Sequence, residues 1–209
     1  MPDWGRYSCL IRFVALLAAA LLYPLFAVPA RIADRFDRTV PPTLDGMAFM
    51  DRAVVVDRDQ RIPLGDEREA MRWIEATLPG SPVVAEVSTA PLLYGWGNRY
   101  AVYTGNPTPI GWDWHERQQR GMVGGDYVAR RITDIQRAYS TTDPEEAYRI
   151  FGRYGVEYFV VGGLERAYYP GGQGKWEERR DVLWELMNEN PGVQIYRIGR
   201  AGAAVTGGP

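Results

Sequence analysis

The stretch FVALLAAALLYPLFAVPA, residues 13–30, is uncharged throughout and lies between Arg12 and Arg31. As an α-helix with a rise of about 1.5 Å per residue it would extend roughly 27 Å, close to the hydrocarbon thickness of a bilayer, about 30 Å. The sequence contains no second apolar run of this length. It therefore predicts one N-terminal transmembrane helix.

Two other interpretations of this run remain open. The small residues 28–30, after a basic start with Arg6 and Arg12, are also typical of a secretory signal peptide. A buried helix of a soluble core is disfavoured, because Pro24 and Pro29 would disturb it, whereas membrane helices tolerate proline better.

The arginines around the run decide its orientation only weakly. Two precede it, and Arg31, Arg35 and Arg38 follow it, so the positive-inside rule leans slightly toward a cytoplasmic C-terminal side. The signal-like order of basic and apolar residues favours the opposite side. We expect the C-terminal part outside the cytoplasm.

Composition excludes several functional classes. The 209 residues carry 24 basic and 26 acidic side chains, a balance that gives no reason to expect a nucleic-acid partner. The single cysteine, Cys9, excludes an intrachain disulfide and a thiolate metal cluster. The single histidine, His115, excludes His-paired zinc motifs. We expect no metal and no cofactor.

The pattern of breaks and periodic segments divides the chain into four parts. Residues 1–30 form the N-terminal flank and transmembrane helix, and residues 31–64, broken by Pro41-Pro42, form a connector. Residues 65–198 alternate helical stripes with short apolar strands, which predicts a compact α/β domain with a small sheet flanked by helices. Residues 199–209 have nothing to pack and are expected to be a disordered tail.

Apolar spacing and capping residues predict the elements of this α/β domain. Helices are expected from Asp66 to Leu78, after Asp126 with Val128, Ile132, Ile135 and Tyr139 on one face, from Asp143 to Tyr154, and near Trp176 to Asn188. Strands are expected at residues 83–87, 156–161 and 193–198, with a further possible strand at residues 100–103.

A long irregular stretch, residues 88–125, holds the main candidate site. Its aromatic content argues against disorder, and loops of this length tend to be functional. Trp112 and Trp114 could present flat apolar faces to sugar rings or lipid tails. Arg117 and Arg120 would then donate to a phosphate.

The same stretch holds the candidate catalytic pair, His115 and Glu116. The histidine could carry a proton if the carboxylate orients it. The alternative is structural: a hydrogen-bonded histidine, tryptophans that fill the loop, and arginines that are simply plentiful. An independent hydrolase is disfavoured, because the sequence shows neither a metal set nor an activated nucleophile.

Two weaker candidates lie next to predicted strands. Glu86 falls within an apolar strand, and a buried carboxylate there needs a partner, for which Arg99 is suited as a further ligand-binding candidate. Glu165-Arg166 follows the strongest strand, at the edge where α/β folds tend to place sites.

Three separated motifs resemble the C-terminal part of the YYY membrane-protein family. They are TLDGM (43–47), TGNPTPIGWDWHERQQR (104–120) and YGVEYFVVGGLER (154–166). They occur in matching order, and the resemblance covers roughly residues 23–198. One departure is Gln119, where the family tends to have tryptophan.

That family consists of large polytopic proteins of uncharacterised function that resemble type-C membrane glycosyltransferases. The resemblance implies a last transmembrane helix at the cell membrane, followed by a soluble α/β domain on the extracytoplasmic side. It also implies a lipid-phosphate-linked sugar as donor, with the catalytic carboxylate in an upstream part that this chain lacks. An upstream polytopic membrane subunit is therefore an expected partner, and the chain is not expected to be active alone.

The expected function is to help position a lipid-phosphate-linked sugar or its acceptor at the membrane face. The alternative is a non-catalytic, tethered module that binds glycan or acts as a scaffold.

Overall fold

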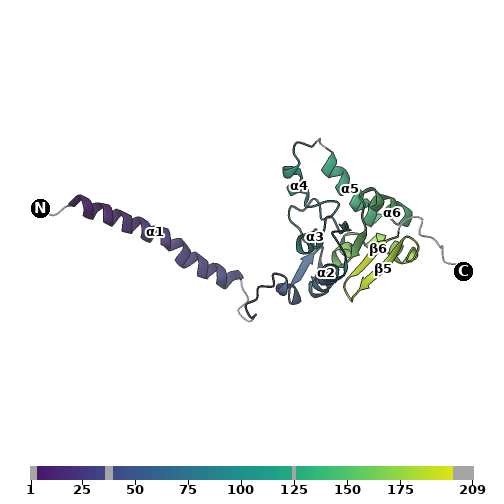
Figure 1. Ribbon diagram of the computed structural model, residues 1–209, viewed down its shortest axis with the longest axis horizontal. Helices are drawn as coiled ribbons and strands as arrows, with labels where there is room; N and C mark the ends of the chain where they lie inside the picture. Colours follow the sequence, from purple (N-terminus) through teal and green to yellow (C-terminus); the bar gives the residue numbers. More distant parts are fainter. Residues whose placement is uncertain (1–3, 36–39, 124–125, 200–209) are drawn as a thin grey trace. The chain divides into compact units, whose positions relative to one another are not determined.

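The computed structural model describes residues 4–35, 40–123 and 126–199. It divides into two units, Met1–Asp45 and Gly46–Pro209 (Figure 1). The predicted fold class, an N-terminal apolar helix followed by a compact α/β domain, is confirmed. Most of the tail expected to be disordered, residues 200–209, lies outside the described residues.

The first unit contains α1, Trp4–Arg35, which extends past both ends of the predicted run and includes Pro24 and Pro29. Within the described part of the chain, its segment Tyr7–Arg35 is the one helix long and apolar enough to cross a membrane. None of the most apolar 18-residue part of this helix is buried. These properties fit a helix surrounded by lipid better than the core helix of a soluble protein.

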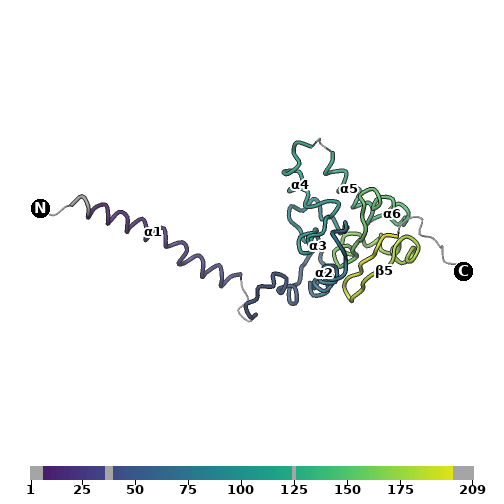
Figure 2. The backbone as a smooth tube through the Cα atoms, viewed as in Figure 1, coloured from purple at the N-terminus to yellow at the C-terminus, as the bar shows by residue number. Residues whose placement is uncertain are grey.

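The second unit is built on a four-stranded sheet in the order β3-β4-β6-β5. Strands β3 (Val84–Ala85) and β4 (Tyr158–Val161) are parallel, whereas β4 with β6 (Gln194–Ile198) and β6 with β5 (Trp184–Glu189) are antiparallel. Figure 2 shows the tube reversing direction after β5, which pairs antiparallel with β6. The sheet is therefore mixed, and its long strands lie at the C-terminal end of the chain.

Alternation along β4 gives the sheet two apolar faces. Phe159 and Val161 face α5 (Tyr127–Ser140) and α6 (Pro144–Arg153), whose buried stripes are those expected from the sequence. Val160 faces the other way, toward α2 (Gly65–Thr77) and α3 (Arg99–Thr104). Helices thus cover both faces, as the near-continuous apolar sequence of β4 requires.

Aromatic side chains dominate the α5–α6 side of the core. The ring centroid of Phe159 lies 4.7 Å from that of Trp176, 5.0 Å from Tyr196 and 5.2 Å from Phe151. All four side chains are buried. Phe159 is therefore the centre of the packing on this face.

Part of the predicted connector is folded. Residues 54–57 (β1) and 60–63 (β2) form an antiparallel hairpin, preceded by a short 3-10 helix at Ala48–Asp51. Met50, Ile62 and Leu64 are buried in the core of the second unit. Each of these three elements is only four residues long, and none buries more than one side chain. The segment therefore shows no helical periodicity in its sequence.

Two predicted elements have the wrong type. Residues 100–103 form part of helix α3 rather than a strand, because the carboxylate of Glu86 accepts the amides of Tyr100 and Ala101 at the start of the helix. The helix predicted near 176–188 is only α8, Gly174–Glu178, followed by strand β5. Pairing with β6 there overrides the helical propensity of the sequence WELM.

Other differences concern element ends and short helices. The strand predicted at 83–87 is limited to Val84–Ala85, because the amide of Val87 donates to the carboxylate of Glu165 and not to the backbone of a neighbouring strand. Helix α2 begins at Gly65, so Asp66 lies in its first turn and not at the N-cap. Helices α4 (Asp113–Gln119) and α7 (Gly163–Tyr168), with a 3-10 turn at Pro170–Gly172, occur where loops were expected.

Replacement of Phe159 by alanine should lower the free energy of unfolding of the second unit by about 3–5 kcal/mol, because it opens a cavity among the rings of Phe151, Trp176 and Tyr196. Urea denaturation of the detergent-solubilised chain, followed by tryptophan fluorescence, measures the change. The matched control is Val182→Ala, whose side chain is 70% exposed and whose effect should stay within about 0.5 kcal/mol. Equal effects of the two substitutions would contradict this packing.

Candidate functional site

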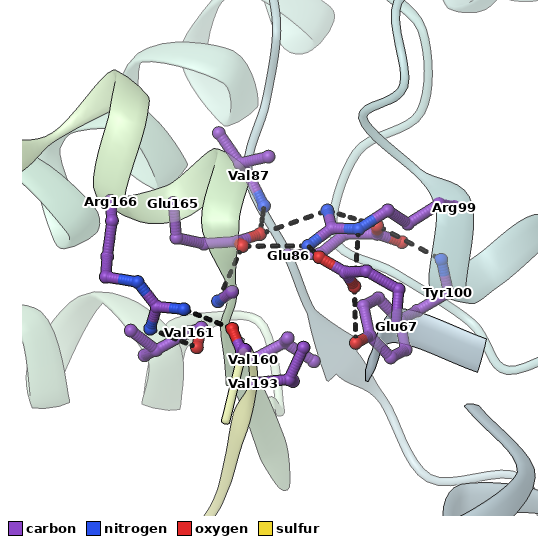
Figure 3. A network of polar contacts seen from close by, with 12 residues as sticks. Glu67, Glu86, Val87, Arg99, Tyr100, Val160, Val161, Glu165, Arg166 and Val193 are labelled. Carbon is purple, nitrogen blue, oxygen red and sulfur yellow. Dashed lines mark hydrogen bonds and ion pairs between the residues drawn. The ribbon is translucent and has the colours of Figure 1, made fainter. Parts of the chain in front are cut away.

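A buried cluster of one arginine and three glutamates joins α2, α3, α7 and the end of β3 (Figure 3). The guanidinium of Arg99 donates to Glu67 at 2.8 and 2.9 Å and to Glu165 Oε2 at 2.8 Å. Its Nη1 lies 3.5 Å from Glu86 Oε2. No member is more than 2% exposed. We call these four residues the Arg99 cluster.

Neighbouring groups complete the hydrogen bonds of the cluster. The hydroxyl of Tyr100 donates to Glu67 at 2.6 Å, and the amides of Val87 and Gly162 donate to Glu165 at 2.9 and 2.8 Å. A Cβ on Gly162 would lie 2.7 Å from Glu67 Oε1, so only glycine allows this close approach. The start of α7 is therefore packed directly against the ion pairs.

Three carboxylates around one guanidinium cannot all ionise at ordinary cost. Burial raises the pKa of Glu86 to about 7, against the opposing effect of Arg99. Burial also acts to raise the pKa of Glu165, but the charge of Arg99 and its hydrogen bonds outweigh this, and the pKa is lowered. Glu86 is therefore the carboxyl group of the cluster that binds a proton near neutral pH.

The expected pairing of Glu86 with Arg99 is confirmed. The structure places the Arg99 guanidinium among carboxylates and out of solvent, where it ties helices together. The sequence did not reveal Glu67 and Glu165 as its partners, because they lie 32 and 66 residues away along the chain. The only available signal was a set of charged residues within apolar stripes.

The aromatic stretch is ordered around Trp112. Its indole Nε1 donates to the carbonyls of Gly95 and Gly97 at 3.1 and 3.0 Å, and its ring meets Tyr94 edge-on at 5.3 Å. Trp112 is half-buried and holds the segment around Tyr94 against the start of α4. Trp114, on α4 itself, is 50% exposed.

The polar candidates on α4 pair with one another along the helix. Arg117 forms an ion pair with Asp113, and Arg120 forms one with Glu116. His115 is exposed and has no hydrogen-bond or ion-pair partner among the described residues. The structure thus brings Glu116 to Arg120 and not to His115.

Exposed apolar side chains gather in the same part of the sequence. Tyr94 contacts Trp112 immediately before α4, and α4 packs on α5. We call the following residues the aromatic surface: Leu92, Leu93, Tyr94, Trp114, Met122 and Val123, which are between 47% and 101% exposed.

A pocket of about 570 Å³ lies elsewhere on the second unit, between the β1–β2 hairpin, α2, α7 and the turn before β6. Three arginines line it, namely Arg58, Arg61 and Arg166, and we call it the arginine pocket. Of the weaker candidates Glu165-Arg166, Arg166 lines this pocket, whereas Glu165 belongs to the Arg99 cluster.

No family model and no curated protein matches the chain. Among solved structures, the chain is similar to the C-terminal globular domain of an oligosaccharyltransferase from Archaeoglobus fulgidus. The identity is 13%, the TM-score is 0.40, and the similarity covers 65% of this chain and 97% of that chain. A likeness at this level is too low to transfer function from one protein to the other.

Substitution Arg99→Met should lower the free energy of unfolding by about 3–5 kcal/mol, because it leaves buried carboxylates without their cation. Arg130→Met is the matched control, since Arg130 is an exposed arginine on α5, and should change stability by no more than about 0.5 kcal/mol. Urea denaturation in detergent measures both. A loss below about 1 kcal/mol for Arg99→Met would mean that the cluster is not a structural requirement.

The raised pKa of Glu86 predicts a pH dependence of stability. The stability that this raised pKa contributes is fully present below pH 4.5, the ordinary pKa of a glutamate, and is lost as the pH rises through about 7. The loss is of the order of 3 kcal/mol. Glu165, with its lowered pKa, acts in the opposite sense, and its contribution is lost only as the pH falls below the ordinary range.

Unfolding free energies measured between pH 4.5 and 7 should therefore decline in the wild type and stay nearly level in Glu86→Gln. The exposed carboxylate Glu178 offers a control, because Glu178→Gln should keep the wild-type decline. A wild-type profile that is flat over this range would contradict the assignment of the proton to Glu86.

Proposed function

We propose that this chain is a membrane-anchored, extracytoplasmic domain of a glycosyltransferase-like protein of the YYY type. Its aromatic surface helps position a lipid-phosphate-linked sugar or the acceptor at the cell membrane. The observation that carries the proposal is that one chain combines the apolar helix α1 with an exposed aromatic and apolar surface on its folded unit. The reaction class is proposed from the resemblance of three motifs of this chain to the YYY family.

The aromatic surface favours an apolar or amphipathic ligand. Contiguous exposed apolar side chains are uncommon on soluble monomers and mark sites of protein, membrane or ligand contact. Removal of apolar area from water contributes about 25 cal/mol per Å². Met122 is 101% and Trp114 50% exposed, so contact with lipid or with a sugar ring would stabilise the bound state.

The arginines of α4 suit a phosphate next to that surface. Arg117 and Arg120 each pair with a carboxylate one turn away on the partly exposed helix. Exposed pairs of this kind contribute about 0–1 kcal/mol, so a phosphate can compete for the guanidinium groups at little cost. Arginine donates to phosphate in the same forked geometry that it uses with carboxylates.

A second candidate function is a non-catalytic, tethered module that binds glycan or acts as a scaffold. It is favoured by the side chains of α4 themselves, since Glu116 pairs with Arg120 and leaves His115 without a carboxylate to orient it. Under either function the chain would act with an upstream polytopic membrane subunit that supplies the chemistry.

The test uses the full chain in the cells that naturally express it, with its gene replaced by a Trp114→Ser, Arg120→Gln double variant. We expect at least a tenfold fall in glycolipid or glycoprotein product, because stacking and phosphate contacts are both removed. Val182→Ser is the control, since it changes an exposed apolar side chain outside the aromatic surface.

Circular dichroism and membrane fractionation establish that both variants remain folded and anchored. Wild-type product levels in a folded, anchored double variant would contradict the transferase role. If such a variant still lost its binding to purified glycan, the result would favour the tethered binding module.

A further inference from the structure

We propose that the arginine pocket binds the phosphoryl group of a small, hydroxyl-bearing organic phosphate such as a sugar phosphate. The inference rests on the pocket's own charges and walls and does not depend on the proposed role of the aromatic surface. The pocket has a volume of about 570 Å³, which is within the range of small-molecule sites.

Arg166 is the fixed cation of this pocket. Its Nη1 donates to the carbonyl of Val161 at 3.1 Å, and its Nη2 donates to the carbonyl of Gly192 (Figure 3). Both acceptors are neutral, so they orient the guanidinium without balancing its charge. The remaining N–H groups are available to a ligand in the pocket, because a guanidinium carries more donors than these two bonds use.

Arg58 and Arg61 add two further positive charges from the hairpin. Arg58 lies in the left-handed region at the turn, with its guanidinium 4.0 Å from the centre of the Tyr168 ring. Arg61 is exposed on β2. Within the described part of the chain, neither these two nor Arg166 forms an ion pair with a carboxylate, whereas most other arginines of the second unit do.

The acidic residues of the lining offset only part of these charges. Both oxygens of Glu67 are occupied by Arg99 and the Tyr100 hydroxyl, and the side chain is 1% exposed. Asp66 is half-buried beside Gly192, where a Cβ would collide with its carboxylate. Asp66 is thus the carboxylate available to accept hydrogen bonds from hydroxyl groups of a ligand.

The rest of the lining sets the chemistry of the ligand body. Ile62, Pro63, Pro191 and Val193 contribute apolar walls. Such walls beside a hydroxyl acceptor fit a polyol or sugar ring, whose C–H faces are apolar and whose edges carry hydroxyls. A dianionic phosphate matches paired guanidinium groups better than a single carboxylate does.

The test is calorimetric titration of the full chain in maltoside micelles at low ionic strength, with glucose 1-phosphate as the probe. We expect measurable binding of glucose 1-phosphate, weaker binding of inorganic phosphate, and none of neutral methyl glucoside. Arg61→Gln and Arg166→Gln should each weaken binding of the probe at least tenfold. The control Arg130→Gln, on α5, should bind as the wild type does.

Arg61→Gln is the decisive variant, because Arg61 is exposed and its replacement leaves the bonds of Arg166 to the backbone intact. Absence of glucose 1-phosphate binding by the wild type, or wild-type affinity in Arg61→Gln and Arg166→Gln, would overturn the proposal.

A second titration distinguishes a soluble phosphate from a lipid headgroup. The full chain is placed in nanodiscs of phosphatidylcholine with or without phosphatidic acid. Weaker binding of glucose 1-phosphate in the presence of phosphatidic acid identifies a lipid headgroup as a competing source of the phosphoryl group. Equal binding identifies a soluble organic phosphate as the ligand.

Discussion

The second unit depends on one buried cation. Arg99 lies at the start of a short helix and pairs with glutamates from α2, α7 and the end of β3. Charges removed from water in this way are stable only while each has its partner, so the four segments are constrained together. The raised pKa of Glu86, about 7, favours a proton on this carboxyl group, which reduces the excess of negative charge around a single guanidinium.

This constraint relates the two candidate binding surfaces. On one side, Arg99 belongs to the stretch whose aromatic residues form the aromatic surface. On the other side, Glu67 lines the arginine pocket, and Glu165 precedes Arg166 on α7. The buried network fixes α2, α3 and α7 relative to one another, so the helix that carries Arg166 and the helix next to the aromatic stretch are held by the same ion pairs.

The parts of the fold that could be predicted from the sequence are those with a clear local signal. The stripe of α5 and the Asp143-Pro144 start of α6 specify helices by spacing and capping, and both are present as expected. The run at 156–161 specifies a buried strand by its β-branched and aromatic residues. Errors occurred at residues 100–103 and 176–188, where a distant carboxylate or a neighbouring strand decides the backbone.

For the candidate site the same division holds. The apolar N-terminal helix, the α/β class and the need of Glu86 for a cation could be predicted, because each follows from residues close together in the chain. The sharing of that cation by Glu67 and Glu165, and the lining of one pocket by three arginines from a hairpin and a helix, became evident in the folded structure. Contacts between residues tens of positions apart arise from the packing of the sheet and its helices, so the local periodicity of the sequence does not predict them.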